Sequence, residues 1–149
     1  MGNKKKRDLR REDKEMMRKW REMAEGGDAE AQVSLGNGYL WGEGVAMNKK
    51  KAAKWFLLAA EQGNARGQLM IGLCYEKGAG VPLDYGAALG WFWRLASQGD
   101  SYGEYKLGLC YLNGRGVEKD MTRAAEWFGK AAEKGNIDAQ YNLGCCYLK

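Results

Sequence analysis

The sequence predicts an all-α fold, an α-solenoid of antiparallel helix pairs that repeats every 36 residues. The segment Ile71–Val81 recurs 36 residues upstream as Leu35–Val45 and 36 residues downstream as Leu107–Val117, and a fourth copy begins at Leu143. Pairs of Trp and Phe recur at the same spacing, and an Asn or Asp precedes each of the seven helices expected after residue 28. A fixed period of this length is typical of a solenoid, in which each unit buries its apolar face against its neighbours.

The N-terminal region predicts a charged tail over residues 1–14, followed by a cap helix. Residues 15–25 place Met16, Met17, Trp20, Met23 and Ala24 along one face at helical spacing. We interpret residues 15–27 as the second helix of an incomplete leading repeat. Such a helix would cap the N-terminal end of the stack, because terminal repeats need a soluble outer face.

Residues 28–63, 64–99 and 100–135 then form three repeats, and 136–149 form a partial one; the whole solenoid spans 15–149. Each repeat holds a first helix, helix A, and a second, helix B. The A helices are expected at 29–41, 65–77, 101–113 and 137–148, and the B helices at 49–62, 85–98 and 121–134. Their N-cap residues are Asp28, Asn64, Asp100, Asn136, Asn48, Asp84 and Asp120, whose side-chain oxygens accept N–H groups of the first turn.

Four glycines, Gly36, Gly72, Gly108 and Gly144, lie in the middle of the A helices, where glycine costs about 1 kcal/mol relative to alanine. We expect helix B to approach closely there through its alanines, which include Ala52 and Ala60. The recurring Tyr, Trp and Phe positions are expected to fill the core between the helices.

The full pattern A-x-x-x-L-G-x-x-Y-x-x-G-x-G-V-x-x-D-x-x-x-A-x-x-W-x-x-x-A-A-x-x-G-N resembles the Sel-one-like repeat, a relative of the tetratricopeptide repeat. The resemblance runs from about Asp28 to the C-terminus. It departs at Gly67 and Gly103, which replace an opening alanine, and at Leu95, which replaces a later one. The resemblance implies an adaptor in protein complexes, such as ubiquitin-ligase or signalling assemblies.

Composition argues against several other classes of function. The net charge is +5, but residues 1–25 hold ten Lys/Arg and six Asp/Glu, so the rest of the chain is nearly neutral. We therefore expect no basic face for nucleic acid. The chain has no histidine, which is the commonest general base and metal ligand, and no catalytic carboxylate pair stands out. We expect no enzyme activity, no cofactor, no metal and no membrane span.

Three cysteines, Cys74, Cys110 and Cys146, occupy one repeat position, and Cys145 precedes the last. Equivalent positions on stacked helices lie too far apart for a disulfide, which needs Cα atoms within about 7 Å. They also differ from the pairs that link helix A to helix B in cysteine-rich secreted relatives of the resembled family. We expect reduced thiols and an intracellular, reducing compartment, either cytoplasm or nucleus.

The candidate binding surface comprises A-helix positions that point away from the core and differ between repeats. These are Trp41, Met70, Leu73, Lys77, Tyr102, Lys106 and Leu109. We expect a protein or peptide segment to lie across this concave face, with Lys77 and Lys106 engaging acidic groups. A simpler explanation for Leu73 and Leu109 is that they pack against the adjacent A helix.

These features favour a non-catalytic scaffold. The alternative is a regulatory or substrate-recruiting module of a larger enzyme complex. A hydrolase, as proposed for some secreted relatives of the resembled family, is disfavoured because histidine is absent. The last A helix has no helix B after it, so we expect either a longer natural protein or association of this C-terminal helix with another molecule.

Overall fold

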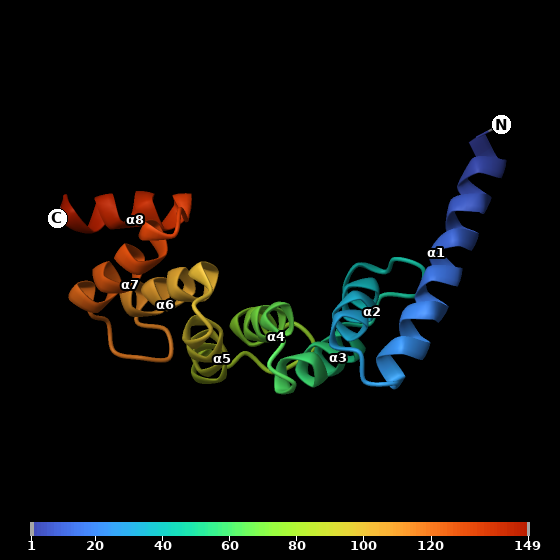
Figure 1. Cartoon of the computed structure of the whole chain (residues 1–149), viewed down its shortest axis with the longest axis horizontal. Helices are drawn as coiled ribbons and strands as arrows, with labels where there is room; N and C mark the ends of the chain where they lie inside the picture. The colour runs from blue at the N-terminus through green and yellow to red at the C-terminus, as the bar shows by residue number, and fades with distance from the viewer. Residues whose placement is uncertain (1, 149) are drawn as a thin grey trace. The chain divides into compact units, whose positions relative to one another are not determined.

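The structure, a computed structural model, describes residues 2–148, and every regular element in that range is an α helix (Figure 1). The helices are α1 (Gly2–Glu25), α2 (Ala29–Trp41), α3 (Lys49–Glu61), α4 (Ala65–Lys77), α5 (Tyr85–Ser97), α6 (Ser101–Asn113), α7 (Met121–Glu133) and α8 (Ile137–Tyr147). The predicted all-α fold and its 36-residue period are confirmed. Every predicted helix boundary between residues 29 and 148 lies within one residue of the observed one.

The chain forms two compact units, which we describe separately. Unit 1 comprises Met1–Met70 with Ala79–Val81, and unit 2 comprises Ile71–Gly78 with Pro82–Lys149. Helix α4 contributes its first half to unit 1 and its second half to unit 2.

The helix starts follow the cap residues in the sequence. Asp28, for example, accepts a hydrogen bond from the Ala31 N–H at 2.8 Å, and Asn48 accepts one from the Lys51 N–H at 3.0 Å. Equivalent bonds from backbone N–H groups are accepted by the other five predicted caps, Asn64, Asp84, Asp100, Asp120 and Asn136. Each bond satisfies an N–H group that has no partner within its own helix, which fixes where the helix begins.

Helix α1 begins earlier than predicted, because residues 2–14 continue the helix instead of forming a tail. Figure 1 shows its first half extending beyond α2. The register of its second half comes from Gly44, where an added Cβ would lie 2.7 Å from the Asp13 carbonyl oxygen. Gly116 stands in the same relation to Tyr85, the first residue of α5. Asp13 therefore occupies the first position of a B helix, and residues 13–25 are the B helix of a leading repeat.

The mid-helix glycines accommodate phenylalanine rings, and not the alanines that we expected. A Cβ at Gly36 would lie 2.5 Å from the Phe56 ring, and one at Gly108 would lie 2.5 Å from the Phe128 ring. A Cβ at Gly72 would likewise lie 2.6 Å from the Phe92 ring. All three rings are fully buried. The glycines are needed because a flat ring, larger than a methyl group, fills the space where a Cβ would stand.

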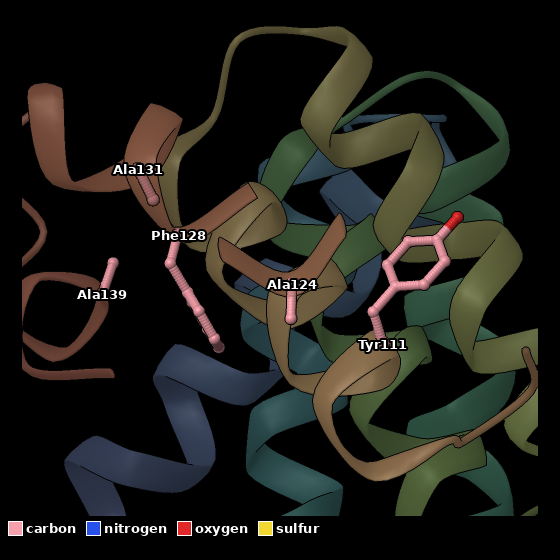
Figure 2. Packing of buried hydrophobic residues seen from close by; sticks show 5 residues of the cluster. All are labelled: Tyr111, Ala124, Phe128, Ala131 and Ala139. Atoms are coloured by element: carbon pink, nitrogen blue, oxygen red, sulfur yellow. The ribbon is translucent and has the colours of Figure 1, made fainter. Parts of the chain in front are cut away.

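In unit 2 the buried cluster combines Tyr111 of α6, three residues of α7 and Ala139 of α8 (Figure 2). The α7 residues are Ala124, Phe128 and Ala131, which share one face of the helix. Trp127 packs against this cluster but is only partly buried. The prediction that the Trp positions are core is therefore wrong in degree: the Phe positions form the core, and the half-buried tryptophans cover its edge.

Candidate interaction surface

In unit 1 the predicted surface residues are Trp41 and Met70. Trp41 is the last residue of α2, and its side chain is 67% exposed. Met70 is half-buried. Glu30 and Arg66, in the first turns of α2 and α4, form an exposed ion pair at 2.9 Å, so two outward positions pair with each other. Such an exposed pair contributes about 0–1 kcal/mol and does not define a binding site.

In unit 2 the most exposed aromatic residue of the predicted set is Tyr102, at 38%. Its ring packs edge-on against Tyr105, with centroids 5.6 Å apart. Tyr105 in turn lies 6.1 Å from the Phe128 ring, which links this surface aromatic pair to the core. Tyr102 is therefore held on a fixed base, which lowers the entropy that it would lose on binding a partner.

The remaining predicted residues of unit 2 differ in accessibility. Lys77 is exposed at the end of α4, whereas Leu73 and Leu109 are half-buried. Leu109 packs against the core cluster of α6, α7 and α8. The simpler interpretation, in which Leu109 serves packing between helices, accounts for its position.

Lys106 does not present a free ammonium group, so the prediction that it engages acidic groups of a partner is wrong. Lys106 is only 7% exposed, and its Nζ lies 2.8 Å from the Glu76 carboxylate, which is itself largely buried. The Nζ also lies 5.3 Å from the centre of the Phe92 ring. The charge is neutralised within unit 2, because α4 supplies the carboxylate from a position 30 residues earlier.

Burial and two nearby carboxylates act on the titration of Tyr105. The pKa of Tyr105 is raised, first by burial, then by the negative charge of Asp138, and further by Tyr102 and Glu76. Asp138 is exposed on α8. Because Lys106 is paired with Glu76, the carboxylate of Asp138 is the charge that a partner would meet beside the tyrosines.

Sequence reasoning missed one internal ion pair, which joins Glu104 to Lys134. Gln32 donates its amide to the Ala24 carbonyl, and Gln140 donates to Ala132, eight residues earlier in each case. At the equivalent position stands Glu104, which as a carboxylate cannot donate. Its Oε1 accepts from Lys134, and its Oε2 is buried with no hydrogen-bond partner among the described residues. The sequence signal for this pair was Glu104 itself, because the equivalent positions of the other repeats, 32, 68 and 140, all hold Gln.

The glutamate at position 104 is explained by its partner, because both residues of the pair differ from those of the first repeat. In the first repeat, Gln62 donates to Gln32 at 2.9 Å, across 30 residues of sequence. In the third repeat, the same two positions hold Glu104 and Lys134, which form an ion pair. Lys134 also donates to the Gly99 carbonyl at 2.8 Å. A hydrogen-bonded amide pair has thus been replaced as a unit by a charged pair.

The four cysteines differ in burial: Cys74 and Cys110 are buried, and Cys145 and Cys146 are partly exposed. Burial raises the pKa of Cys74 and Cys110 to about 11, so both remain protonated near neutral pH. No disulfide joins the cysteines in the described part of the chain, and Cys145 is half-exposed. Within residues 2–148 there is also no group of three or more Cys, Asp or Glu placed to hold a metal ion. None of the helices in that range is both long enough and apolar enough to traverse a lipid bilayer.

Comparison with protein families gives one match. The family model described as Sel1 repeat matches residues 29–64, 65–100, 101–136 and 137–149. A search of curated proteins found no match.

Several solved structures resemble this chain. A Sel1 repeat protein from Oxalobacter formigenes is 38% identical, with a TM-score of 0.84 over 88% of this chain and 54% of that one. The c5321 protein, a protective antigen of uropathogenic Escherichia coli, is 36% identical, with a TM-score of 0.85 over 88% of this chain and 28% of that one. Cysteine-rich protein B of Helicobacter pylori is 24% identical with a TM-score of 0.70, over 91% of this chain and 97% of that one, and shows the shared fold alone. This chain therefore spans about half of the first relative and about a quarter of the second.

Proposed function

Because this chain belongs to the Sel1 repeat family, whose members are generally protein-interaction scaffolds, we propose that it is a non-catalytic adaptor that binds a protein or peptide segment on its A-helix surface. The anchors in this proposal are Trp41 in unit 1 and Tyr102 in unit 2. Leu73 and Met70 supply apolar contacts, and Lys77 supplies the accessible cation.

The observation that carries the proposal is the exposure of Trp41. Its side chain is 67% exposed, although the equivalent positions of the next two repeats hold the polar residues Lys77 and Asn113. The repeat itself does not require a tryptophan there. Large aromatic side chains supply most of the binding energy in many protein interfaces.

The chemistry of the surface also limits the partner. Asp138 lies close enough to raise the pKa of Tyr105, so a partner that places a carboxylate at the tyrosine pair would be repelled there. Lys77, in contrast, is exposed and would favour an acidic group at the end of α4. A segment that binds unit 2 therefore carries an apolar residue for Tyr102, with an acidic side chain only near Lys77.

An adaptor of this kind would serve equally as a substrate-recruiting module of a larger enzyme complex. We place either role in a reducing compartment inside the cell, because no disulfide joins the cysteines within residues 2–148. We do not expect nucleic acid as a partner, because the charge of residues 26–149 is nearly balanced.

The test uses peptides selected on the purified chain from a random library displayed on phage. Their affinity is then measured for the wild-type chain and for the double variant Trp41→Ala, Tyr102→Ala. We expect the double variant to lose at least about 30-fold in affinity, the factor that corresponds to about 2 kcal/mol. Its circular dichroism spectrum and melting temperature should stay close to those of the wild-type chain, because both side chains are exposed.

The matched control is Leu58→Ala, which removes an exposed apolar side chain of helix α3. This variant should bind the same peptides as tightly as the wild-type chain does. If the double variant keeps full affinity, the binding surface lies elsewhere on the molecule. An equal loss in both variants would also contradict the assignment, because it would indicate general apolar adhesion.

A further inference from the structure

In unit 1, exposed cations gather on two neighbouring B helices, α1 and α3. Those of α1 follow one another at intervals of four and three residues, so they share one face of the helix. We call the whole set the basic patch; its six members are Lys14, Arg18 and Arg21 of α1 and Lys50, Lys51 and Lys54 of α3. The charge of residues 26–149 is nearly balanced in total, but three of its cations stand together in this short stretch of α3.

The exposure of this surface belongs to the repeat itself. Lys50 and Lys54 stand 36 residues after Lys14 and Arg18, so the two pairs occupy equivalent positions of successive B helices. Both positions are exposed in α1, α3, α5 and α7 alike. In α5 they hold two glycines, and in α7 a threonine and a glutamate, so neither helix of unit 2 carries a cation there. The basic patch is therefore a feature of unit 1 and not of the fold.

Two cations of the patch, from different helices, meet on Tyr39 of α2. Arg21 donates to the Tyr39 hydroxyl through Nη2 at 3.1 Å. The Nζ of Lys51 lies 5.5 Å from the centre of the Tyr39 ring. The tyrosine thus fixes two positive charges at one point on the surface of unit 1.

The third repeat balances the equivalent cation with a carboxylate. The guanidinium of Arg123 lies 5.8 Å from the centre of the Tyr111 ring, and its Nε lies 3.6 Å from the Asp120 carboxylate. In the first repeat, the residue at the position of Asp120 is the neutral Asn48. The two cations on Tyr39 therefore lack the carboxylate that accompanies the single cation on Tyr111.

The patch is unfavourable for the chain on its own. Lys14 with Arg18, and Lys50 with Lys54, place like charges four residues apart on one helix, which destabilises that helix. Helix α3 also begins with three lysines and has no acidic residue in its first turn, where the helix dipole favours anions. Among the side chains that the structure describes, none of the six cations forms an ion pair. An anionic partner would relieve both of these costs.

We propose that the basic patch binds an acidic segment of a partner protein, an extended stretch rich in Asp and Glu. Glu15 and Glu22 border the patch on α1 and Glu61 borders it on α3, and all three are exposed. A lipid surface or a nucleic-acid duplex is wider than the patch and would also meet these carboxylates, whereas a single acidic strand lies between them. Tyr39 is only 8% exposed, so its ring offers no open face on which a nucleic-acid base could stack.

This surface differs from the adaptor surface. The patch lies on the B helices α1 and α3, whereas Trp41 and Tyr102 belong to A helices. None of its six cations is among the residues assigned to the adaptor surface. The inference therefore stands or fails independently of the proposed function.

The test measures the binding of a fluorescein-labelled peptide of about ten glutamates by fluorescence anisotropy, at a low salt concentration of about 50 mM. The wild-type chain should bind this peptide, and about 300 mM salt should weaken the affinity at least fivefold, because exposed charges are screened. Arg18→Glu with Lys54→Glu should weaken the affinity at least about tenfold. The double variant Trp41→Ala, Tyr102→Ala should bind the glutamate peptide as the wild-type chain does.

The matched control is Lys119→Glu with Lys130→Glu, which makes the same change in net charge at two exposed lysines of unit 2. This control should keep its affinity within about twofold of the wild type, because the patch itself is unchanged. Equal losses in the control and in the patch variant would overturn the proposal, since net charge alone would then explain binding. Circular dichroism should show unchanged helical content in both.

Lys50→Glu separates binding from folding. It places a carboxylate in the first turn of α3 and removes a like charge four residues before Lys54. The melting temperature should therefore rise while the affinity for the glutamate peptide falls. A lower melting temperature would contradict the cost that we assign to the patch, and an unchanged affinity would contradict the site.

Two other anions test the class of partner. One is a single-stranded oligonucleotide of about ten thymidines, and the other is a vesicle of phosphatidylserine in phosphatidylcholine. Both should bind the wild-type chain more weakly than the glutamate peptide does. The proposal is overturned if either binds more tightly, or if the peptide shows no binding at chain concentrations up to about 100 µM.

Discussion

Replacing Gly108 by alanine tests the close packing of the phenylalanine rings. A Cβ at Gly108 would lie 2.5 Å from two atoms of the Phe128 ring, far inside van der Waals contact. The ring is fully buried, so it has no open space into which to move. Overpacking of this kind costs about 1–3 kcal/mol, and the higher helix propensity of alanine offsets about 1 kcal/mol. We expect Gly108→Ala to lose up to about 2 kcal/mol of unfolding free energy.

Gly144→Ala is the matched control, because it makes the same change at the same position of the last repeat. No atom lies within 4 Å of the added Cβ, so only the gain in helix propensity remains. We expect Gly144→Ala to gain about 0.5 kcal/mol, since the residue lies near the end of α8. Urea unfolding followed by circular dichroism measures both, at a concentration below any self-association. If Gly108→Ala gains as much stability as Gly144→Ala does, the ring does not occupy that space.

Three further predictions follow from burial. Phe92→Ala should cost about 3–5 kcal/mol in urea unfolding, and Trp91→Ala clearly less, since Phe92 is fully buried and Trp91 is half-buried; equal losses would contradict this assignment. Burial raises the pKa of Cys74 to about 11, so the folded chain keeps a proton that the unfolded chain releases near pH 9. Unfolding free energy should therefore fall between about pH 9 and pH 11, and iodoacetamide should label Cys145 faster than Cys74, as mass spectrometry would show. Glu104→Gln should keep or raise the unfolding free energy, by up to about 1 kcal/mol, because the amide can donate to the Ala96 carbonyl, as Gln32 and Gln140 donate to the equivalent carbonyls. A clear loss would show that the ion pair with Lys134 contributes more to stability.

Most of the fold was predictable because local signals repeat. In the first repeat, Asp28 and Asn48 mark the starts of the two helices, and Asn or Asp stands at the same positions in the later repeats. A glycine follows each B helix where the chain needs a positive φ, as at Gly63, whose φ is 88°. Three copies in register let each signal confirm the next. The length of α1 was not predictable in this way, because residues 2–12 precede the first repeat-equivalent position, Asp13.

The packing partner of the mid-helix glycines was predicted wrongly for a physical reason. Periodicity shows that Gly36 requires a close neighbour, but Ala52, Phe56 and Ala60 share the same period. Only the geometry of the helix crossing decides which of them lies opposite the glycine. The ring of Phe56 takes that place, and the alanines pack beside it.

Not every residue that differs between repeats indicates a binding site. Lys106 and Glu76 break the repeat together and neutralise each other at 2.8 Å, and Glu104 and Lys134 do the same. Such departures are compensated inside the molecule and need no partner to explain them. Trp41 also breaks the repeat, yet it stays 67% exposed. A departure that is exposed and uncompensated is the one that stability does not explain, which is why the adaptor proposal rests on Trp41 and not on Lys106.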